Sequence, residues 1–328
     1  MIRLDRRACL ALATASLLPK LSHADEPAIP DKAVRLIVGF GQGGGLDLTA
    51  RLIQPRLEPR VGRRITVENK AGGIGAAAGE ALKNGPNDGS QLALMPSTTI
   101  ASRLFSNSFP FDPLTDVAPI TTVGTFPMAI AVAPGIGVTS LEEYVAWLKQ
   151  GDSDRRRMGS NALFDAFAQM YGKMFAKELG TPIDIVDYRS ANSIIADLTD
   201  NRIPAVAAGL PTLLQYHRGG KVRILCVTSP KRAPTAPKIP TVHELGHPGL
   251  EMVEWYGFYT GGRAPERTID AWNVHLRAIV DQKDMTFQLS ELGLIVETST
   301  PEAMKKRIVE HLQLWRERAQ TLGFTAAK

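Results

Sequence analysis

The chain has 328 residues, of which 44% are hydrophobic and 22% charged, a composition typical of a globular protein large enough for two domains. Its formal net charge is +5, but the first 24 residues hold four basic residues and one acidic residue, so the remainder carries only +2. This near-balance excludes the dense basic face of a nucleic-acid-binding protein, and we expect no nucleic-acid partner.

The first 24 residues have the order of a secretory signal. Three arginines precede the uncharged apolar run 8–18, and Ser22-His23-Ala24 forms a small-residue cleavage site. The apolar run is too short for a membrane-spanning helix, which needs about 20 residues. We predict cleavage after Ala24 and a periplasmic location for the mature chain. The route is the general secretory one or, because of the Arg6-Arg7 pair, the twin-arginine one.

The first part of the mature chain predicts a parallel sheet. Residues 34–40 are a short β-branched apolar run typical of a strand buried on both faces, and a glycine-rich loop separates them from a helix beginning near Leu46. This alternation continues with predicted elements at 65–68 (strand), about 76–83 (alanine-rich helix) and 91–95 (strand). Pro55 and Pro59 predict that the first helix kinks or stops near Gln54, because a proline inside a helix costs ~3 kcal/mol.

The rest of the chain repeats the alternation and then changes character. The predicted strands are 128–133, 183–186, 205–208 and 222–227, and the predicted helices are 140–149 and 164–179. After Ser229 we expect a proline-punctuated loop, then a short helix at 242–245, an aromatic strand at 255–259 and three helical stretches ending near 320. The basic cluster Arg155-Arg156-Arg157 is predicted to be a solvated loop.

The sequence contains no Ser/Gly-rich linker, so strands must join the two domains. We place the crossings near 122–127 and near 228. The predicted first domain is therefore 25–126 together with 229–328, and the second domain is 127–228. Two such crossings allow hinge closure around a ligand.

The strongest local signal is the glycine-rich segment 39–47, which joins a buried strand to the start of a helix. Ligands of open α/β sheets bind at the carboxyl ends of strands, and a helix start offers free N–H groups and positive dipole. We interpret Asp47 as the helix N-cap, which offsets part of the dipole and favours a carboxylate over a polyphosphate. The segment lacks the GK[ST] of a P-loop and the third glycine of a dinucleotide fingerprint. A tight turn without any ligand remains the alternative.

The chain shows no motif that predicts catalysis. It has no G-x-S-x-G and no HExxH, and once the signal is removed Cys226 is left alone, which excludes an intrachain disulfide and a cysteine-based zinc site. We therefore predict no enzyme activity, no metal and no cofactor.

Several short segments, in one order and spacing, resemble the Bug family, the substrate-binding proteins of tripartite tricarboxylate transporters. They are the strand 34–38 before the GGG-x-D loop, Val67-Glu68-Asn69-Lys70-Ala71-Gly72-Gly73, Pro86-Asn87-Asp88-Gly89, Phe109-Pro110-Phe111-Asp112-Pro113, Gly220-Lys221-Val222-Arg223-Ile224-Leu225, Ile239-Pro240-Thr241-Val242 and Trp255-Tyr256-Gly257. The resemblance runs from about Pro30 to the C-terminus. It implies an α/β, two-domain periplasmic-binding-protein-like fold (type II), with two hinge strands and a ligand cleft between the domains. It also implies a non-catalytic monomer that binds a small carboxylate and delivers it to a membrane permease.

The resemblance also carries ligand-binding residues to this chain by position. From the first domain these are Phe40, Gly41, Gln42, Gly43, Gly44, Gly45, Asp47, Ser97 and Thr98. From the second domain they are Gly159, Ser160, Asn161, Tyr188, Arg189, Ser190, Ala208 and Gly209. A helix start from each domain would then face one cleft.

The chain departs from the family pattern at both sides of this cleft. Gly41-Gln42 stands where the family has Pro or Ala, Leu46 replaces Thr or Ser, and the run 158–164 has lost glycines, a serine and a histidine. Tyr188-Arg189-Ser190 replaces Tyr-Lys-Gly and retains a positive charge that can fork onto a carboxylate. These changes lead to the hypothesis of an acid with an apolar or aromatic body. The alternatives are that Leu163 and Phe164 are simply core and that Arg189 is a solvated surface residue.

Two other functions remain open from sequence. A signalling protein that presents its closed form to a membrane sensor would use the same pocket with another partner surface. An exported α/β enzyme is the third alternative, which turnover without stoichiometric binding would support.

Overall fold

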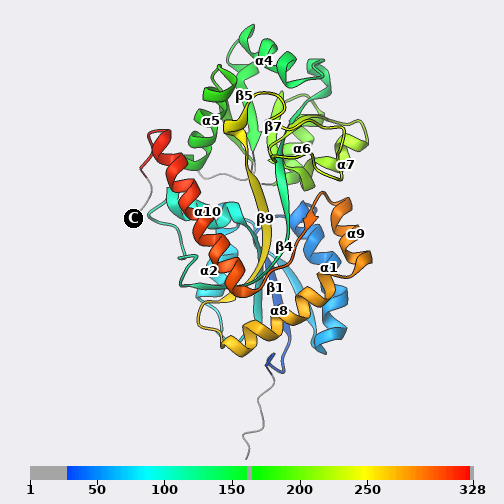
Figure 1. Cartoon of the computed structure of the whole chain (residues 1–328), viewed down its shortest axis with the longest axis vertical. Coiled ribbons are helices and arrows are strands. Elements are labelled where there is room, and N and C mark those ends of the chain that lie inside the picture. The colour runs from blue at the N-terminus through cyan, green and yellow to red at the C-terminus, as the bar shows by residue number, and fades with distance from the viewer. Residues whose placement is uncertain (1–27, 161–164, 189, 326–328) are drawn as a thin grey trace, which may run out of the picture.

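The computed structural model describes residues 28–160, 165–188 and 190–325 as two α/β lobes stacked along the long axis of the molecule (Figure 1). The described residues form one ten-stranded mixed sheet with the order β2-β1-β3-β9-β4-β7-β5-β6, and β8 and β10 also pair with β4. The predicted α/β fold with two lobes is confirmed. Among these residues, no helix is long and apolar enough to cross a bilayer.

The first lobe is built on the three strands that the sequence predicts as parallel. They are β1 (Val34–Val38), β2 (Ile65–Asn69) and β3 (Gln91–Pro96), and both pairs are parallel. The helices of this lobe are α1 (Gly45–Val61), α2 (Ala76–Lys83), α3 (Ser97–Ala101), α8 (Glu266–Val280), α9 (Lys283–Glu291) and α10 (Pro301–Thr321). β1 and β3 are almost wholly buried, because helices cover both faces of a parallel sheet.

The second lobe repeats this arrangement on a smaller scale. Its strands are β5 (Arg157–Ser160), β6 (Asp184–Asp187), β7 (Ala205–Gly209) and β8 (Arg223–Val227). Its helices are α4 (Leu141–Lys149), α5 (Asp165–Leu179), α6 (Ala191–Thr199) and α7 (Leu210–Arg218). Ser140 caps α4 as its sequence position predicts, accepting a hydrogen bond from the Glu143 N–H at 3.1 Å.

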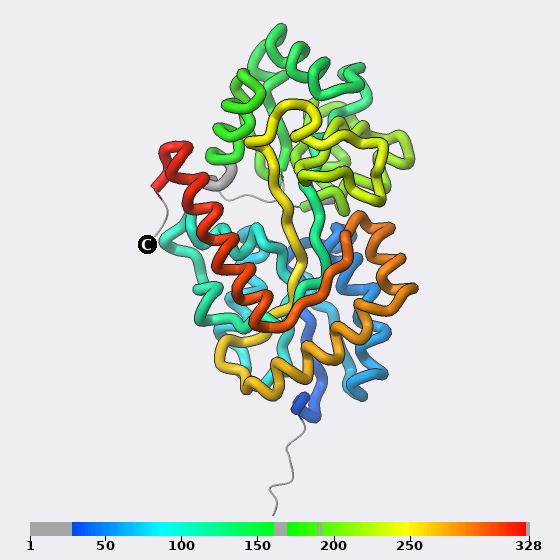
Figure 2. The backbone as a smooth tube through the Cα atoms, viewed as in Figure 1, coloured from blue at the N-terminus to red at the C-terminus, as the bar shows by residue number. Residues whose placement is uncertain are grey.

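Two long strands connect the lobes. β4 (Val117–Val132) pairs with β9 (Val253–Gly261) as far as Pro127, and from Met128 onward it pairs with β7 and β8 instead. Figures 1 and 2 show β4 and β9 side by side where the chain passes between the lobes. β10 (Ile295–Val296) adds to β4 on the first-lobe side.

The segment after β8 packs with the second lobe and not the first. Ala233, Ala236 and Ile239 share a buried cluster with residues of β7, β8 and α7, and Val227 bridges Thr241. We therefore propose that the first domain resumes near the start of β9 and not at residue 229. The domain boundaries as a whole remain a proposal.

Three local predictions are wrong. α1 does not stop near Gln54 but continues to Val61. Pro55 and Pro59 both lie on its exposed side, where the carbonyls that lose a hydrogen-bond partner can face water, and Ile53 and Leu57 pack inward. Residues 242–245 form a turn and not a helix, and Gly246 at φ +82° ends it. Arg157 belongs to β5, not to a solvated loop.

α10 bridges the lobes on one side of the molecule (Figure 1). It packs on β4 and α3, and near its C-terminal end Trp315 stacks on Tyr171 of α5 in the second lobe, with ring centroids 5.7 Å apart. Phe324, just beyond α10, lies under Lys173 of the same helix α5 at 4.5 Å.

Candidate ligand-binding site

A pocket lies where the two lobes meet, against the crossing strands. It has a volume of about 60 Å³ and is lined by Phe40, Gly41, Gly44, Gly45, Leu46, Pro96, Thr98, Phe126, Met128, Gly209, Thr212, Glu254 and Tyr256. Because a buried water needs roughly 10–15 Å³ of such space, there is room for a group of a few heavy atoms between the lobes. Most of the wall is apolar or backbone, with one carboxyl side chain, Glu254, in this lining.

The glycine-rich loop forms the first-lobe side of the pocket. Gly44 is the N-cap of α1, with extended backbone and no side-chain cap, so the first-turn N–H groups at Gly45 and Leu46 have no partner within the helix. Both residues line the pocket, as the anion-site interpretation requires. Gly43 has φ +81°, a conformation that favours glycine, and it turns the chain toward the helix.

The N-cap interpretation of Asp47 is wrong, because the helix begins three residues earlier than that reading assumed. Asp47 reaches back from the first turn, and its Oδ2 accepts the Gly43 N–H at 2.9 Å. Its carboxylate also accepts from Arg51 Nε at 3.0 Å and Asn69 Nδ2 at 2.9 Å. Burial raises the pKa of Asp47, but these hydrogen bonds outweigh it and hold the pKa below its ordinary value. Asp47 thus holds the loop in place as an anion and does not line the pocket.

The second lobe closes directly over this loop. A Cβ placed on Gly41 would come within 3.8 Å of the Ser190 side chain, and one on Gly45 within 2.7 Å of Pro211 Cβ. Asn192 Nδ2 donates to the Gln42 carbonyl at 3.3 Å. Ser190 caps α6 and Gly209 is the N-cap of α7, so helix starts from both lobes converge on the pocket.

Six of the predicted contact residues line the pocket, namely Phe40, Gly41, Gly44, Gly45, Thr98 and Gly209. The others in the described part of the chain are not in its lining, namely Gln42, Gly43, Asp47, Ser97, Gly159, Ser160, Tyr188, Ser190 and Ala208. Asn161 and Arg189 lie outside the described residues, as do Leu163 and Phe164. That the predicted set binds the ligand stays a prediction.

Several of the predicted residues outside the lining have structural roles. Ala208 and Gly159 are strand residues packed in the second lobe, the former opposite Ala129 and the latter beside Ile194. Ser160 is fully buried at the end of β5, and its Oγ has no hydrogen-bond partner in the part of the chain that the structure describes.

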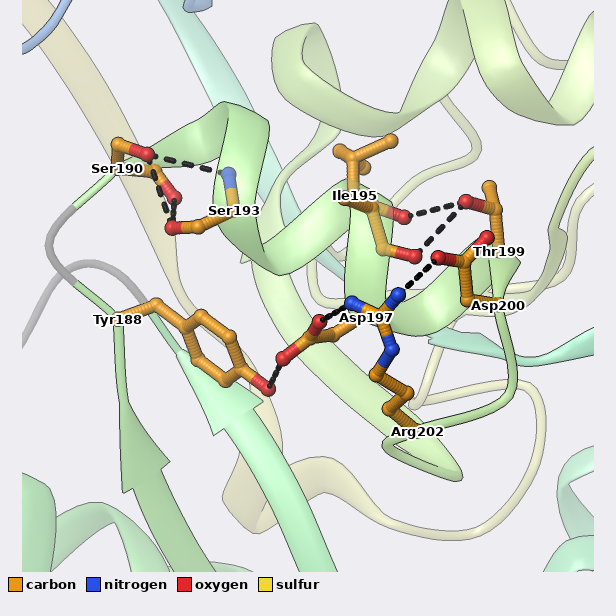
Figure 3. A network of polar contacts seen from close by, with 9 residues as sticks. Tyr188, Ser190, Ser193, Ile195, Asp197, Thr199, Asp200 and Arg202 are labelled. Atoms are coloured by element: carbon orange, nitrogen blue, oxygen red, sulfur yellow. Dashed lines mark hydrogen bonds and ion pairs between the residues drawn. The ribbon is translucent and has the colours of Figure 1, made fainter.

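Tyr188 belongs to a polar network of the second lobe (Figure 3). Its hydroxyl donates to Asp197 Oδ2 at 2.8 Å, and Arg202 binds the other oxygen of the same carboxylate at 2.8 Å. Burial and the bond to Asp197 raise the pKa of Tyr188 to about 12. The network ties the chain before α6 to the end of that helix, and so fixes where Ser190 starts it.

The crossing strands provide a wall of the pocket that the sequence motifs did not predict. Phe126 and Met128 of β4 and Glu254 and Tyr256 of β9 line the pocket, and Glu254 lies opposite Phe126 in the strand register. Residues two apart on a strand share a face, so Glu254 places a carboxyl group on the same face as two aromatic side chains. The feature of the sequence that could have indicated this wall is Glu254, an acidic residue in a strand of otherwise aromatic and apolar character.

The residues present do not suggest a metal site. Among the described residues, no group of three His, Cys, Asp or Glu side chains is arranged to hold a metal ion. Cys226 is buried and unpaired in β8, and burial raises its pKa to about 12, so it is a thiol packed in the core.

Two α/β lobes joined by paired strands, with helix starts converging on a pocket at the crossing, define the class of solute-binding proteins. Comparison with known proteins agrees with this class. Residues 49–323 match the family model of the tripartite tricarboxylate transporter family receptor. The chain is 26% identical to protein BugT of Bordetella pertussis over 306 residues, covering 93% of this chain and 92% of that protein.

Solved structures agree as well. A protein of R. palustris solved with adipate superimposes with a TM-score of 0.84 at 26% identity, covering 91% of this chain and 99% of that one. The periplasmic binding protein BugD superimposes with a TM-score of 0.83 at 24% identity, covering 91% and 100%. The chain belongs to the tripartite tricarboxylate transporter receptor family, as the sequence motifs indicated.

Proposed function

We propose that this protein is exported with cleavage of its first 24 residues, captures a small carboxylate in the periplasm and delivers it to a tripartite tricarboxylate-type membrane transporter. The observation that carries the proposal is the pair of helix starts, α1 from one lobe and α7 from the other, that meet over the pocket. The unpartnered N–H groups of α1 and the positive ends of both helix dipoles favour an anion between them.

The nature of the pocket wall supports an acid with an apolar body. Phe40, Leu46, Phe126, Met128 and Tyr256 surround the polar groups. Phe126 and Tyr256 are themselves in contact, with ring centroids 4.5 Å apart. The related protein solved with adipate supports a carboxylate as the ligand class.

Isothermal titration tests the proposal with a panel of aliphatic and aromatic mono- and dicarboxylates. We expect one or more of these acids to bind with one-to-one stoichiometry and no turnover. Gly45→Ala should weaken that binding by about tenfold or more, because its Cβ would meet Pro211 and hold the lobes apart.

Gly219→Ala is the matched control, since its Cβ would meet nothing nearer than 3.4 Å and it lies away from the pocket. Binding by no acid of the panel, in protein that is shown to be folded, would contradict the proposed function. Equal affinity in the two glycine variants would contradict the role of the glycine loop.

A further inference from the structure

Glu254 is a buried carboxyl group that lacks a full set of partners in the described structure. The residue is 1% exposed. Its Oε2 accepts a hydrogen bond from the Ser97 hydroxyl, which in turn accepts the Trp255 N–H at 3.0 Å. Its Oε1 is buried and has no hydrogen-bond partner among the described residues. Leaving such an oxygen unpartnered costs about 1–3 kcal/mol, and more if the group is charged.

The position of the Glu254 side chain connects it with the ligand. Glu254 lines the pocket from β9, at the point where that strand crosses between the lobes. The glycine loop lies across the pocket and offers N–H donors, which suit a carboxylate. The pocket therefore has donors on the α1 side and an acceptor on the β9 side.

The groups around Glu254 do not neutralise it by direct pairing. Arg318 of α10 acts on it electrostatically, but its guanidinium donates to the Glu251 carbonyl and lies over the ring of Trp315. Tyr171 of α5 interacts with the Glu254 charge. His311 of α10 bonds the backbone of Ser97, and its Nε2 accepts the Trp315 Nε1–H at 3.0 Å. A ligand atom that donates a hydrogen bond would supply the missing partner.

We infer, on the basis of the proposed function, that the ligand is an acid that also carries a nitrogen hydrogen-bond donor, an amide or an ammonium group. Glu254 would accept the hydrogen bond from this nitrogen. In this arrangement the carboxylate of the ligand faces the start of α1 and its nitrogen faces Oε1. When Glu254 is ionised, a second carboxylate at that end of the ligand would face it without a donor between them, which is unfavourable. Glu254 is thus a specificity-determining residue of this pocket.

Matched acids test this inference by isothermal titration near pH 8. Succinate is compared with succinamate and γ-aminobutyrate, and adipate with adipamate and ε-aminocaproate, so that within each series only the far group changes. We expect the wild-type protein to bind an amide or ammonium member at least about tenfold more tightly than the diacid of the same series, as a hydrogen bond to a charged group provides.

Glu254→Gln should reduce this preference to near unity or reverse it, because a glutamine amide can donate to a carboxylate. Glu142→Gln, an exposed position on α4, should leave the preference unchanged. Circular dichroism and thermal unfolding establish that each variant is folded, and the comparison of ligands on the wild-type protein needs no variant.

Diacids that bind the wild-type protein as tightly as their nitrogen-bearing counterparts would overturn this inference and leave the proposed function intact. Binding by no member of either series, and by no acid of the wider panel, would overturn both. A preference that survives in Glu254→Gln would also overturn the inference, because the discrimination would then come from elsewhere in the pocket.

Discussion

Two buried carboxyl groups lie close to the same pocket, and their surroundings shift their pKa values in opposite directions. Asp47, behind the glycine loop, accepts hydrogen bonds from Gly43, Arg51 and Asn69, and its pKa is lowered. Glu254, on the crossing strand, accepts one hydrogen bond from the described residues, that of Ser97, and burial raises its pKa to about 7 against the lowering effect of Ser97 and Arg318. A fully partnered carboxylate fixes local structure, whereas a partly partnered one is available to a ligand.

The largest effect on stability is expected from removing the Asp47 carboxylate. Asp47→Ala should lower the free energy of unfolding by about 2–4 kcal/mol, because it removes the hydrogen bonds that Gly43, Arg51 and Asn69 donate to this buried carboxylate. Urea denaturation measures this loss.

Asp47→Asn is the matched variant, since its side-chain oxygen retains an acceptor of the same shape, and it should lose less. If Asp47→Ala is as stable as the wild-type protein, the carboxylate does not hold the glycine loop in the way that its contacts indicate.

Because of Glu254, the stability of the protein should depend on pH. Its folded pKa of about 7 lies above the unfolded value of 4.5, so the folded state favours the protonated form. This contribution is fully present below about pH 4.5 and is lost as the pH rises through 7, with a maximum loss of about 3 kcal/mol. Glu254→Gln removes this titration, so its stability relative to the wild-type protein should rise between pH 5 and pH 8.

Thermal unfolding of both proteins across that range measures the difference. His311 titrates with the opposite sign, since burial lowers its pKa to about 3 and its contribution is lost as the pH falls below 6.5. Taking the difference between the two proteins cancels His311, Arg318 and Tyr171, which both retain. A difference that does not change with pH would show that Glu254 titrates normally.

The smallest effect is expected at Tyr188, which the sequence placed in the site. Tyr188→Phe removes the hydrogen bond to Asp197 and should cost about 1 kcal/mol of stability in urea denaturation. Because its hydroxyl faces that network (Figure 3), ligand affinity should change by less than about threefold. A large loss of affinity with unchanged stability would place the hydroxyl on the ligand instead.

What could be predicted from the sequence depends on how far apart the interacting residues lie along the chain. The strand, loop and helix from Val34 to Val61 are contiguous, and their periodicity and glycines predicted the first-lobe side of the pocket. The bond between Ser97 and Glu254 joins residues 157 positions apart, and no local pattern predicts such a pair. Pro55 and Pro59 misled for a related reason, because their cost depends on which side of α1 faces water.

Through α10, a motion of the two lobes would also change contacts near the C-terminal end of the chain. It starts on the first lobe, yet its Trp315 stacks on Tyr171 of the second lobe, and Phe324 lies under Lys173. Any rotation of one lobe away from the other must slide or separate these contacts. The indole of Trp315 is therefore an intrinsic fluorescent reporter: its emission should change as the two lobes separate, without any label.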